Sequence, residues 1–438
     1  MMFITSNVRN WTKFHTACLA LASLFSTSAA GQPIRIATYN SNYLSACINH
    51  VRAEALQQTL DLLKADVIAF QEVRDRNALE KFLPATEWTV VIDDDSTDDQ
   101  NLAFAVRHGV DYFLLSGETS NAGNEDFLFR SSSNFPDKRD VLALGIRSHF
   151  MGEDKELVLL NHHAKSRYGG RVTTEPTRIA AAMEINTWIN DNYPDTTIVL
   201  GDFNDNPDDA SLNTLESGME SPLLVENDPG TFLVNLSEPL LLDDHVSYGL
   251  NSRSYITTER ILIDHTDTGS RERNATQYSD DINVGKAMYD QILVSSASAN
   301  VIYQGKAKLF EYFEAVTGNS DTRASDHLPV YVDAFIPPTQ IKSVTPNPIG
   351  TDNNNETLII QINDPDWISS GMYLKDASGH AYLMPAFSPG TYVMTITPQD
   401  TAFSLNNGGD TIYLYDADDR EIDMVQYTSS NEGEAIAF

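Results

Sequence analysis

The chain has 438 residues, and its 62 Asp and Glu against 29 Lys and Arg give a formal net charge of −33. A hydrophobic share of 41% excludes an intrinsically disordered chain, and the length favours two or three domains of roughly 100–200 residues each. Two cysteines exclude a disulfide scaffold. The negative charge disfavours general electrostatic binding to nucleic acid, so a polyanionic substrate would require a local basic patch or metal ions.

Residues 1–30 have the features of a secretory signal peptide. Arg9 and Lys13 precede a short apolar run at residues 16–25, and small residues at 28–30 form a cleavage site. The apolar run is far shorter than the ~20 residues that span a bilayer, so a signal peptide is favoured over a membrane anchor. We expect a secreted or periplasmic protein without a transmembrane segment. It would begin near Gly31 with a net charge of about −35, because cleavage removes two positive charges from −33.

From residue 34 onward, short β-branched runs alternate with amphipathic helices, which is typical of a layered α/β domain. Helices are predicted at residues 50–64 and 176–190, the second with Pro176 in its first turn. Strands are predicted at residues 34–40, 66–70, 101–107, 141–146, 157–160, 197–200, 291–295 and 329–335. So many strands with few helices between them indicate two packed sheets flanked by helices over residues 31–336.

The composition shifts where Pro337 and Pro338 interrupt the strand pattern, and we place a stiff linker at residues 337–340. Residues 341–438 show strand runs separated by turn signals, and almost no helical periodicity. About a hundred residues of this kind predict a small β-sandwich domain.

Polar and titratable side chains stand at the ends of the predicted strands of the α/β region. These residues are Asn40, Glu72, His163, Asp202, Asn204, Asp290, Asp326 and His327. Strand ends lift side chains out of the core into a common crevice, where ligands of α/β sheets tend to bind. One such residue would be a solubilising cap, but the whole series predicts a functional site.

Carboxylates with Asn and without Cys form a hard, all-oxygen ligand set, which suits Mg²⁺, Mn²⁺ or Ca²⁺ and not zinc. Two histidines beside such a metal supply proton transfer near neutral pH, because their ordinary pKa is ~6.5. Hydrolysis of a phosphate ester requires a cation on the phosphate oxygens, an oriented water and an acid for the leaving oxygen. The residues of this series fit that chemistry.

The segments RIATYN, ADVIAFQEV, LLNHHAKS, TIVLGDFND, YDQILVS and SDHLPVYVDAF occur in this order. Together they resemble the motif series of the endonuclease/exonuclease/phosphatase superfamily, which includes pancreatic-type deoxyribonucleases. The resemblance covers residues 34–335, and residues 161–166 (NHHAKS) further resemble secreted bacterial nucleases. It implies a four-layered α/β sandwich, with two β-sheets between outer helices, and hydrolysis of phosphodiester bonds.

Carried over by position, the resemblance implies a metal site and a catalytic set. Glu72 would bind the metal ion, with Asn40 beside it and Asp326 completing or supporting the site. Magnesium is the expected ion, with Mn²⁺ or Ca²⁺ as alternatives.

The remaining strand-end residues would perform the reaction. Asp202 and Asn204 would position the attacking water and the phosphate, and His163 would contact the phosphate or act as an acid. His327 would be the second catalytic histidine, oriented by Asp290 or another carboxylate. Which histidine is the acid and which the base stays open.

A basic cluster follows His163 directly. It comprises Lys165, Arg167, Arg171 and Arg178, which we interpret as substrate-binding residues that contact phosphates rather than as ordinary surface charges. The pair Asp264-His265 is a weaker alternative to Asp326-His327, since it precedes the YDQILVS segment instead of following it.

Residues 341–427 resemble a lamin-tail domain, an immunoglobulin-like β-sandwich appended to secreted bacterial nucleases. The turn-rich segments MYLKDASGHAYLM and LNNGGDTIYLYDADDREID carry this resemblance. No catalytic residues cluster there, so binding or spacing is the expected role.

The leading hypothesis is a secreted, divalent-metal-dependent nuclease that hydrolyses extracellular DNA, with RNA and the endonucleolytic or exonucleolytic mode left open. A phosphatase or a sphingomyelinase-like phospholipase of the same fold is the first alternative, since all use the same catalytic parts. A catalytically inactive binding protein is the second, and retention of every motif residue disfavours it. We infer no protein partner and expect a monomer.

Overall fold

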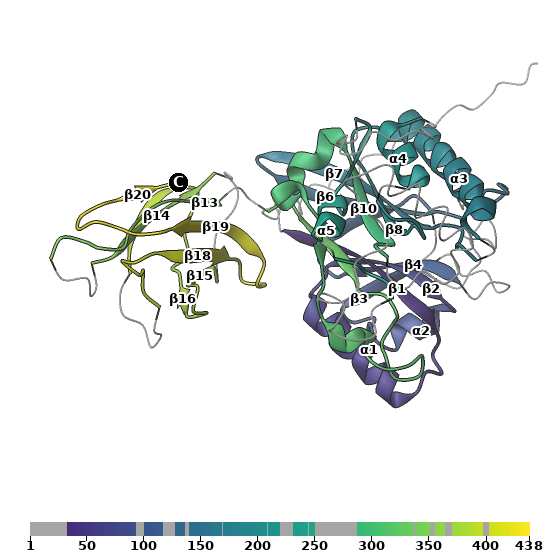
Figure 1. The fold of residues 1–438 in the computed structure, drawn as a ribbon, viewed down its shortest axis with the longest axis horizontal. Helices are drawn as coiled ribbons and strands as arrows, with labels where there is room; N and C mark the ends of the chain where they lie inside the picture. The colour runs from purple at the N-terminus through teal and green to yellow at the C-terminus, as the bar shows by residue number, and fades with distance from the viewer. Residues whose placement is uncertain are drawn as a thin grey trace, which may run out of the picture.

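The computed structural model of the chain describes residues 33–92, 100–116, 128–135, 140–168, 170–207, 209–219, 231–243, 245–249, 287–336, 339–350, 355–363, 370–396 and 403–438. The expected signal peptide, Pro337, Pro338 and the pair Asp264-His265 lie outside these residues. No helix in the described ranges is long and apolar enough to cross a bilayer. Figure 1 shows a larger α/β domain, residues 33–336, beside a smaller C-terminal β domain, residues 339–438.

The first sheet of the α/β domain has the strand order β11-β12-β1-β2-β4-β3. Strands β1 and β2 are parallel, and the other neighbours are antiparallel. The strands are β1 (Ile34–Leu44), β2 (Val67–Val73), β3 (Trp88–Ile92), β4 (Asn101–Arg107), β11 (Lys308–Leu309) and β12 (Val330–Ala334).

The second sheet has the order β5-β6-β7-β8-β10-β9, in which β7 and β8 are the parallel pair. Its strands are β5 (Asp111–Leu114), β6 (Leu142–Phe150), β7 (Glu153–His163), β8 (Thr197–Asp202), β9 (Leu233–Asn235) and β10 (Asp290–Ser295). Each sheet therefore contains one parallel pair, and these two pairs carry Asn40, Glu72, His163 and Asp202 near their C-terminal ends.

The two sheets face each other across one apolar core. Successive side chains of a pleated strand point to opposite faces of the sheet, so the side chains of the second sheet are divided between two cores. Leu159 and Leu200 share a core with the first sheet, whereas Leu160 and Val199 share a core with Ile185 of the outer helix α3. Figure 1 shows α3 and α4 on one side of the paired sheets and α1 and α2 on the other. The predicted mixed α/β class, with sheets flanked by helices, is confirmed.

The helices are short except for α3. They are α1 (His50–Leu63), α2 (Arg76–Glu80), α3 (Arg171–Asn192), α4 (Ala210–Ser217) and α5 (Glu238–Leu242), with 3₁₀ turns η2 (Ser296–Val301), η3 (Tyr303–Gly305) and η4 (Phe313–Val316). The predicted start of the second helix was wrong. Helix α3 begins five residues earlier, so Pro176 lies inside it. The polar segment RVTTE lacks apolar periodicity, but the Thr174 hydroxyl donates to the Gly170 carbonyl at 3.1 Å and supports this first turn.

The C-terminal β domain contains two four-stranded antiparallel sheets, ordered β17-β14-β13-β20 and β16-β15-β18-β19. The strands are β13 (Thr339–Thr345), β14 (Thr357–Ile362), β15 (Tyr373–Lys375), β16 (Ala381–Leu383), β17 (Gly390–Thr395), β18 (Asp410–Tyr415), β19 (Glu421–Tyr427) and β20 (Ile436–Ala437). Apolar residues of both sheets, including Ile360 and Leu414, share one core.

The two domains touch at a set of polar contacts. The Arg420 guanidinium binds the Asp66 carboxylate at 2.6 Å, and Lys64 pairs with Asp419. Asp66 precedes β2, whereas Glu72 lies near the C-terminal end of that strand. The C-terminal β domain is therefore docked at the sheet edge opposite to the predicted site.

Candidate active site

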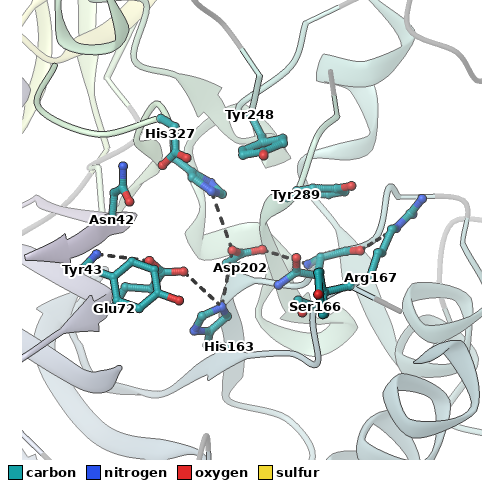
Figure 2. Close-up of a pocket in the computed structure, with 13 residues that line it drawn as sticks. Asn42, Tyr43, Glu72, His163, Ser166, Arg167, Asp202, Tyr248, Tyr289 and His327 are labelled. Atoms are coloured by element: carbon teal, nitrogen blue, oxygen red, sulfur yellow. Dashed lines mark hydrogen bonds and ion pairs between the residues drawn. The ribbon is translucent and has the colours of Figure 1, made fainter. Parts of the chain in front are cut away.

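Six of the eight predicted strand-end residues line one pocket of about 250 Å³, at the edge where the C-terminal ends of the parallel strands converge, and Asn40 and Asp290 contact them from behind the lining. Figure 2 shows Asp202 near the centre, with His163 and His327 on different sides of it. The described residues that line the pocket are Asn42, Tyr43, Glu72, His163, Ser166, Arg167, Tyr168, Asp202, Asn204, Tyr248, Tyr289, Asp326 and His327.

Strand register places Asp202 between two other predicted residues. Asp202 ends β8, where it lies opposite His163 of β7 and opposite Asp290 of β10. The preceding residue, Gly201, has a φ of +149°, and a Cβ there would lie 1.8 Å from the carbonyl oxygen of His162. Only glycine therefore allows β8 to approach β7 closely enough for this arrangement.

Both histidines point a ring nitrogen toward Asp202. The Nε2 atom of His163 lies 3.6 Å from Asp202 Oδ2 and 3.9 Å from Glu72 Oε1. The Nε2 atom of His327 lies 3.8 Å from the same Asp202 oxygen. The Nδ1 atom of His327 lies 2.6 Å from Asp290 Oδ2, which fixes the ring orientation and directs Nε2 into the pocket.

Burial and charge shift the pKa values of this group. Burial raises the pKa of Asp202 to about 7, although His327 acts in the opposite direction. Burial alone would lower the pKa of His327, but the carboxylates of Asp290, Asp202 and Asp326 outweigh it and raise that pKa above its ordinary value. A carboxyl group that titrates near neutrality thus faces an imidazole that keeps its proton.

The first sheet contributes Asn40 and Glu72. The Asn40 amide nitrogen donates to Asp202 Oδ2 at 2.9 Å and to Glu72 Oε1 at 3.3 Å, so it links the two sheets. Glu72 also accepts from the backbone N–H of Tyr43 at 3.1 Å. Glu72 and Tyr43 have left-handed φ values of 58° and 52°, a backbone conformation that concentrates at functional sites.

A family model described as the endonuclease/exonuclease/phosphatase family matches residues 40–334, which is more than half of the chain. This chain belongs to the endonuclease/exonuclease/phosphatase family. The matched segment contains every residue of the pocket, and it ends before the C-terminal β domain. Members of this family generally hydrolyse phosphodiester bonds, which is the reaction class that the motif series predicted.

Several solved structures are similar to this chain at low identity. D. rerio TDP2 complexed with single-strand DNA product is 17% identical with a TM-score of 0.45, covering 69% of this chain and 98% of that chain. Truncated C. elegans TDP2 is 15% identical with a TM-score of 0.43, covering 70% and 99%. The human Nocturnin catalytic domain is 14% identical with a TM-score of 0.39, covering 69% and 93%. No curated protein matches the chain. These distant matches say nothing about its substrate.

Members of this family use divalent metal ions, and the donor set fits a magnesium-type site. Within the described ranges, no three His, Cys, Asp or Glu side chains form a group that would hold a metal unaided. Magnesium needs no such cage, because it binds through one or two carboxylates, several waters and the phosphate of the substrate. Glu72, whose side chain is 14% exposed and lines the pocket, supplies carboxylate oxygens for such a site.

The side chain of Asn40 faces the carboxylates of the site. Its oxygen accepts from the backbone N–H of Asn42 at 2.9 Å, and its nitrogen donates to Glu72 and Asp202. Asn40 therefore orients both carboxylates, and its part in metal binding stays a prediction. Asp326 lines the pocket 3.3 Å from the Arg323 guanidinium, and its part in metal binding stays a prediction.

The predicted phosphate contact of Arg178 is wrong, whereas that of Arg167 stays a prediction. Arg178 is 2% exposed, and its guanidinium binds Asp205 at 2.5 Å. Arg167 lines the pocket, but it is 5% exposed, binds Asp205 at 2.9 Å and pairs with Asp209 as well. Burial demands a partner for each of these charges, and the carboxylates supply it.

Both arginines hold the loop that follows β8. The Arg167 guanidinium donates to the backbone carbonyl of Asn204 at 2.8 Å, and thus holds the residue whose N–H donates to Asp202 at 2.9 Å. Lys165 is half-buried outside the pocket lining, and the Arg171 side chain lies beyond what the structure describes. Their contact with phosphate stays a prediction.

Four tyrosines of the pocket were missed by the sequence analysis. Tyr248 and Tyr289 stack with ring centres 5.2 Å apart, and Tyr248 also packs 4.9 Å from His327. Tyr43 and Tyr168 line the rim. Tyr289 and Tyr168 adjoin the Asp290 and NHHAKS motifs, a signal that was available, whereas Tyr248 lies in a segment without any motif.

Proposed function

We propose that this protein is a secreted, divalent-metal-dependent nuclease that hydrolyses phosphodiester bonds of extracellular DNA and also of RNA. The observation that carries this proposal is the approach of His163 and His327 to one carboxylate, Asp202, at 3.6 and 3.8 Å. Family membership supports the reaction class. The apolar run and cleavage site at residues 16–30 support secretion.

His327 is suited to act as the acid. Asp290 binds its Nδ1 atom, so Nε2 carries the proton that faces the pocket. Because the carboxylates hold its pKa above the ordinary value, His327 is a cation at neutral pH. It would stabilise the negative charge that develops on the phosphate and donate its proton to the leaving oxygen. Asp290 would act through His327 as a positioning residue.

Asp202 is suited to accept a proton from the attacking water. Its pKa of about 7 lies near the operating pH, which favours general base catalysis. Hydrogen bonds from Asn40 and from the Asn204 backbone fix its two oxygens. When bound at Glu72, the metal ion would supply positive charge to the non-bridging oxygens of the phosphate. His163, between Glu72 and Asp202, would contact the same phosphate.

The C-terminal β domain would be an immunoglobulin-like sandwich of the lamin-tail type with a binding or spacing role. Its two antiparallel sheets around one core support this assignment. It contacts the α/β domain at the sheet edge opposite to the pocket, and this position supports a role outside catalysis.

The test is a substrate panel with the purified full-length protein. Supercoiled plasmid, linear duplex DNA, single-stranded DNA, RNA, sphingomyelin and p-nitrophenyl phosphate are each incubated with Mg²⁺, Mn²⁺, Ca²⁺ or EDTA, with His327→Ala as the inactive control. We expect metal-dependent cleavage of nucleic acid. Nicking of the plasmid would identify an endonuclease. Hydrolysis of sphingomyelin or the monoester alone would replace the nuclease proposal with the phospholipase or phosphatase alternative.

A further inference from the structure

Three aromatic side chains of the described residues are exposed, and two of them lie at the rim of the catalytic pocket. Tyr168 is 79% exposed and Tyr43 is 41% exposed, and both line the pocket. The third is Phe438, at 44% exposure, in the C-terminal β domain. Folding buries large aromatic rings, so two exposed rings beside one site indicate a binding surface.

Tyr43 is held in place although it is exposed. The Gln100 side chain donates to its hydroxyl, and the Arg74 guanidinium lies 5.9 Å from its ring centre. Figure 2 shows Tyr43 beside Glu72, on the other side of Asp202 from Arg167. Tyr168 lines the same pocket and follows Arg167 directly in the chain. Both rings therefore lie beside the catalytic group.

The charges of the pocket bear on how much these rings contribute to substrate binding. Among the described residues that line it, Arg167 is the only lysine or arginine, and its charge is matched by Asp205 and Asp209. Binding that rests on phosphate neutralisation requires cations that are available to the phosphates. Beyond the metal ion and His327 at the scissile phosphate, contacts with the bases are therefore a further source of affinity for a nucleic acid.

We propose that Tyr43 and Tyr168 stack nucleobases that neighbour the scissile phosphate, and that the preferred substrate is consequently single-stranded nucleic acid. Bases of a single strand can turn outward and stack on aromatic side chains, whereas the faces of duplex bases are covered by their neighbours. This inference rests on the proposed nuclease function and names its substrate class.

The experiment compares two single-stranded oligonucleotides of equal length, one with ordinary bases and one with abasic internal positions, cleaved by the full-length enzyme. Tyr168→Ala and Tyr43→Ala should each raise the KM for the oligonucleotide with bases by ~10-fold, with little change in kcat. Neither should change the KM for the abasic strand. Tyr168→Phe, which keeps the ring, should restore the parent KM. Phe438→Ala is the matched exposed control and should have no effect.

The wild-type enzyme should also cleave the single strand with a lower KM than the same sequence in a duplex. Equal effects of Tyr168→Ala on the ordinary and abasic strands would overturn the stacking role, as would a preference for the duplex. If the wild-type enzyme cleaves no oligonucleotide with any metal, the proposed function itself fails, and this outcome is distinct from a failure of the stacking role alone.

Discussion

Asp66 is partly buried and Asp202 is buried, so burial opposes the negative charge of both carboxylates, and each has a different kind of cation beside it. At the docking face, burial raises the pKa of Asp66, and Arg420, at 2.6 Å, lowers it. In the pocket, burial raises the pKa of Asp202, and His327, at 3.8 Å, lowers it. Arginine stays charged at every accessible pH, whereas histidine titrates. The first pair is therefore a fixed contact between domains, and the second is able to exchange a proton.

The largest effect should come from the two histidines. His327→Ala and His163→Ala should each lower kcat by ~10²-fold or more, as expected for lost proton transfer or phosphate stabilisation. Circular dichroism should show an unchanged fold. Arg420→Ala is the matched control from the docking face and should keep kcat near the parent value. A folded His327→Ala enzyme with parent turnover would remove Asp326-His327 from the site and favour Asp264-His265.

Glu72→Gln should weaken metal binding because it removes the charge of the ligand and keeps its shape. We expect ~10-fold lower activity at limiting Mg²⁺ and partial recovery when the metal is in excess. A magnesium titration of initial rates measures this shift. An unaltered magnesium dependence would show that Glu72 is not a ligand.

The pH dependence should follow the Asp290–His327 pair. Asp290 raises the pKa of His327, so Asp290→Asn should lower it. Activity that needs the protonated imidazole is lost as pH rises through this pKa. The alkaline limb of the kcat/KM profile should therefore move to lower pH in the variant. An alkaline limb at the parent position would mean that His327 does not act as the acid.

A smaller effect is expected from the docking face. Arg420→Ala leaves the partly buried Asp66 without its closest cation and should lower the free energy of unfolding by ~1–3 kcal/mol. Chemical denaturation measures this change.

A chain that ends near residue 336 should still fold and cleave short oligonucleotides, because none of the described residues that line the pocket lies beyond it. Oligonucleotide cleavage by the truncated chain checks this. A folded but inactive truncated chain would show that the C-terminal β domain completes the site.

The α/β class and the strand ends that form the site were predictable from the sequence. The alternation of apolar residues and the order of the motifs are both local patterns. The sequence could not predict the fate of Arg167 and Arg178. Their partner Asp205 lies 38 and 27 residues away in the chain, and only the packing of α3 against the loop after β8 brings them together. For Arg178, proximity to His163 in the sequence was taken for proximity to the phosphate.

The orientation of individual side chains could not be predicted from the sequence either. The position of Asn40 was predicted, but the direction of its amide depends on a turn to Asn42 and on carboxylates of both sheets. Tyr248 reaches the pocket from a segment without a motif, through its packing on Tyr289 and His327. These features arise from contacts between distant segments, which no local pattern records.

The most direct test of the central claim is single-turnover cleavage of one end-labelled, single-stranded oligodeoxynucleotide by the full-length enzyme, with Mg²⁺ and then with EDTA. The geometry around Asp202, His163 and His327 predicts cleavage that the chelator abolishes and that fresh Mg²⁺ restores. Intact substrate with Mg²⁺, Mn²⁺ and Ca²⁺ alike, from a folded protein, would contradict it.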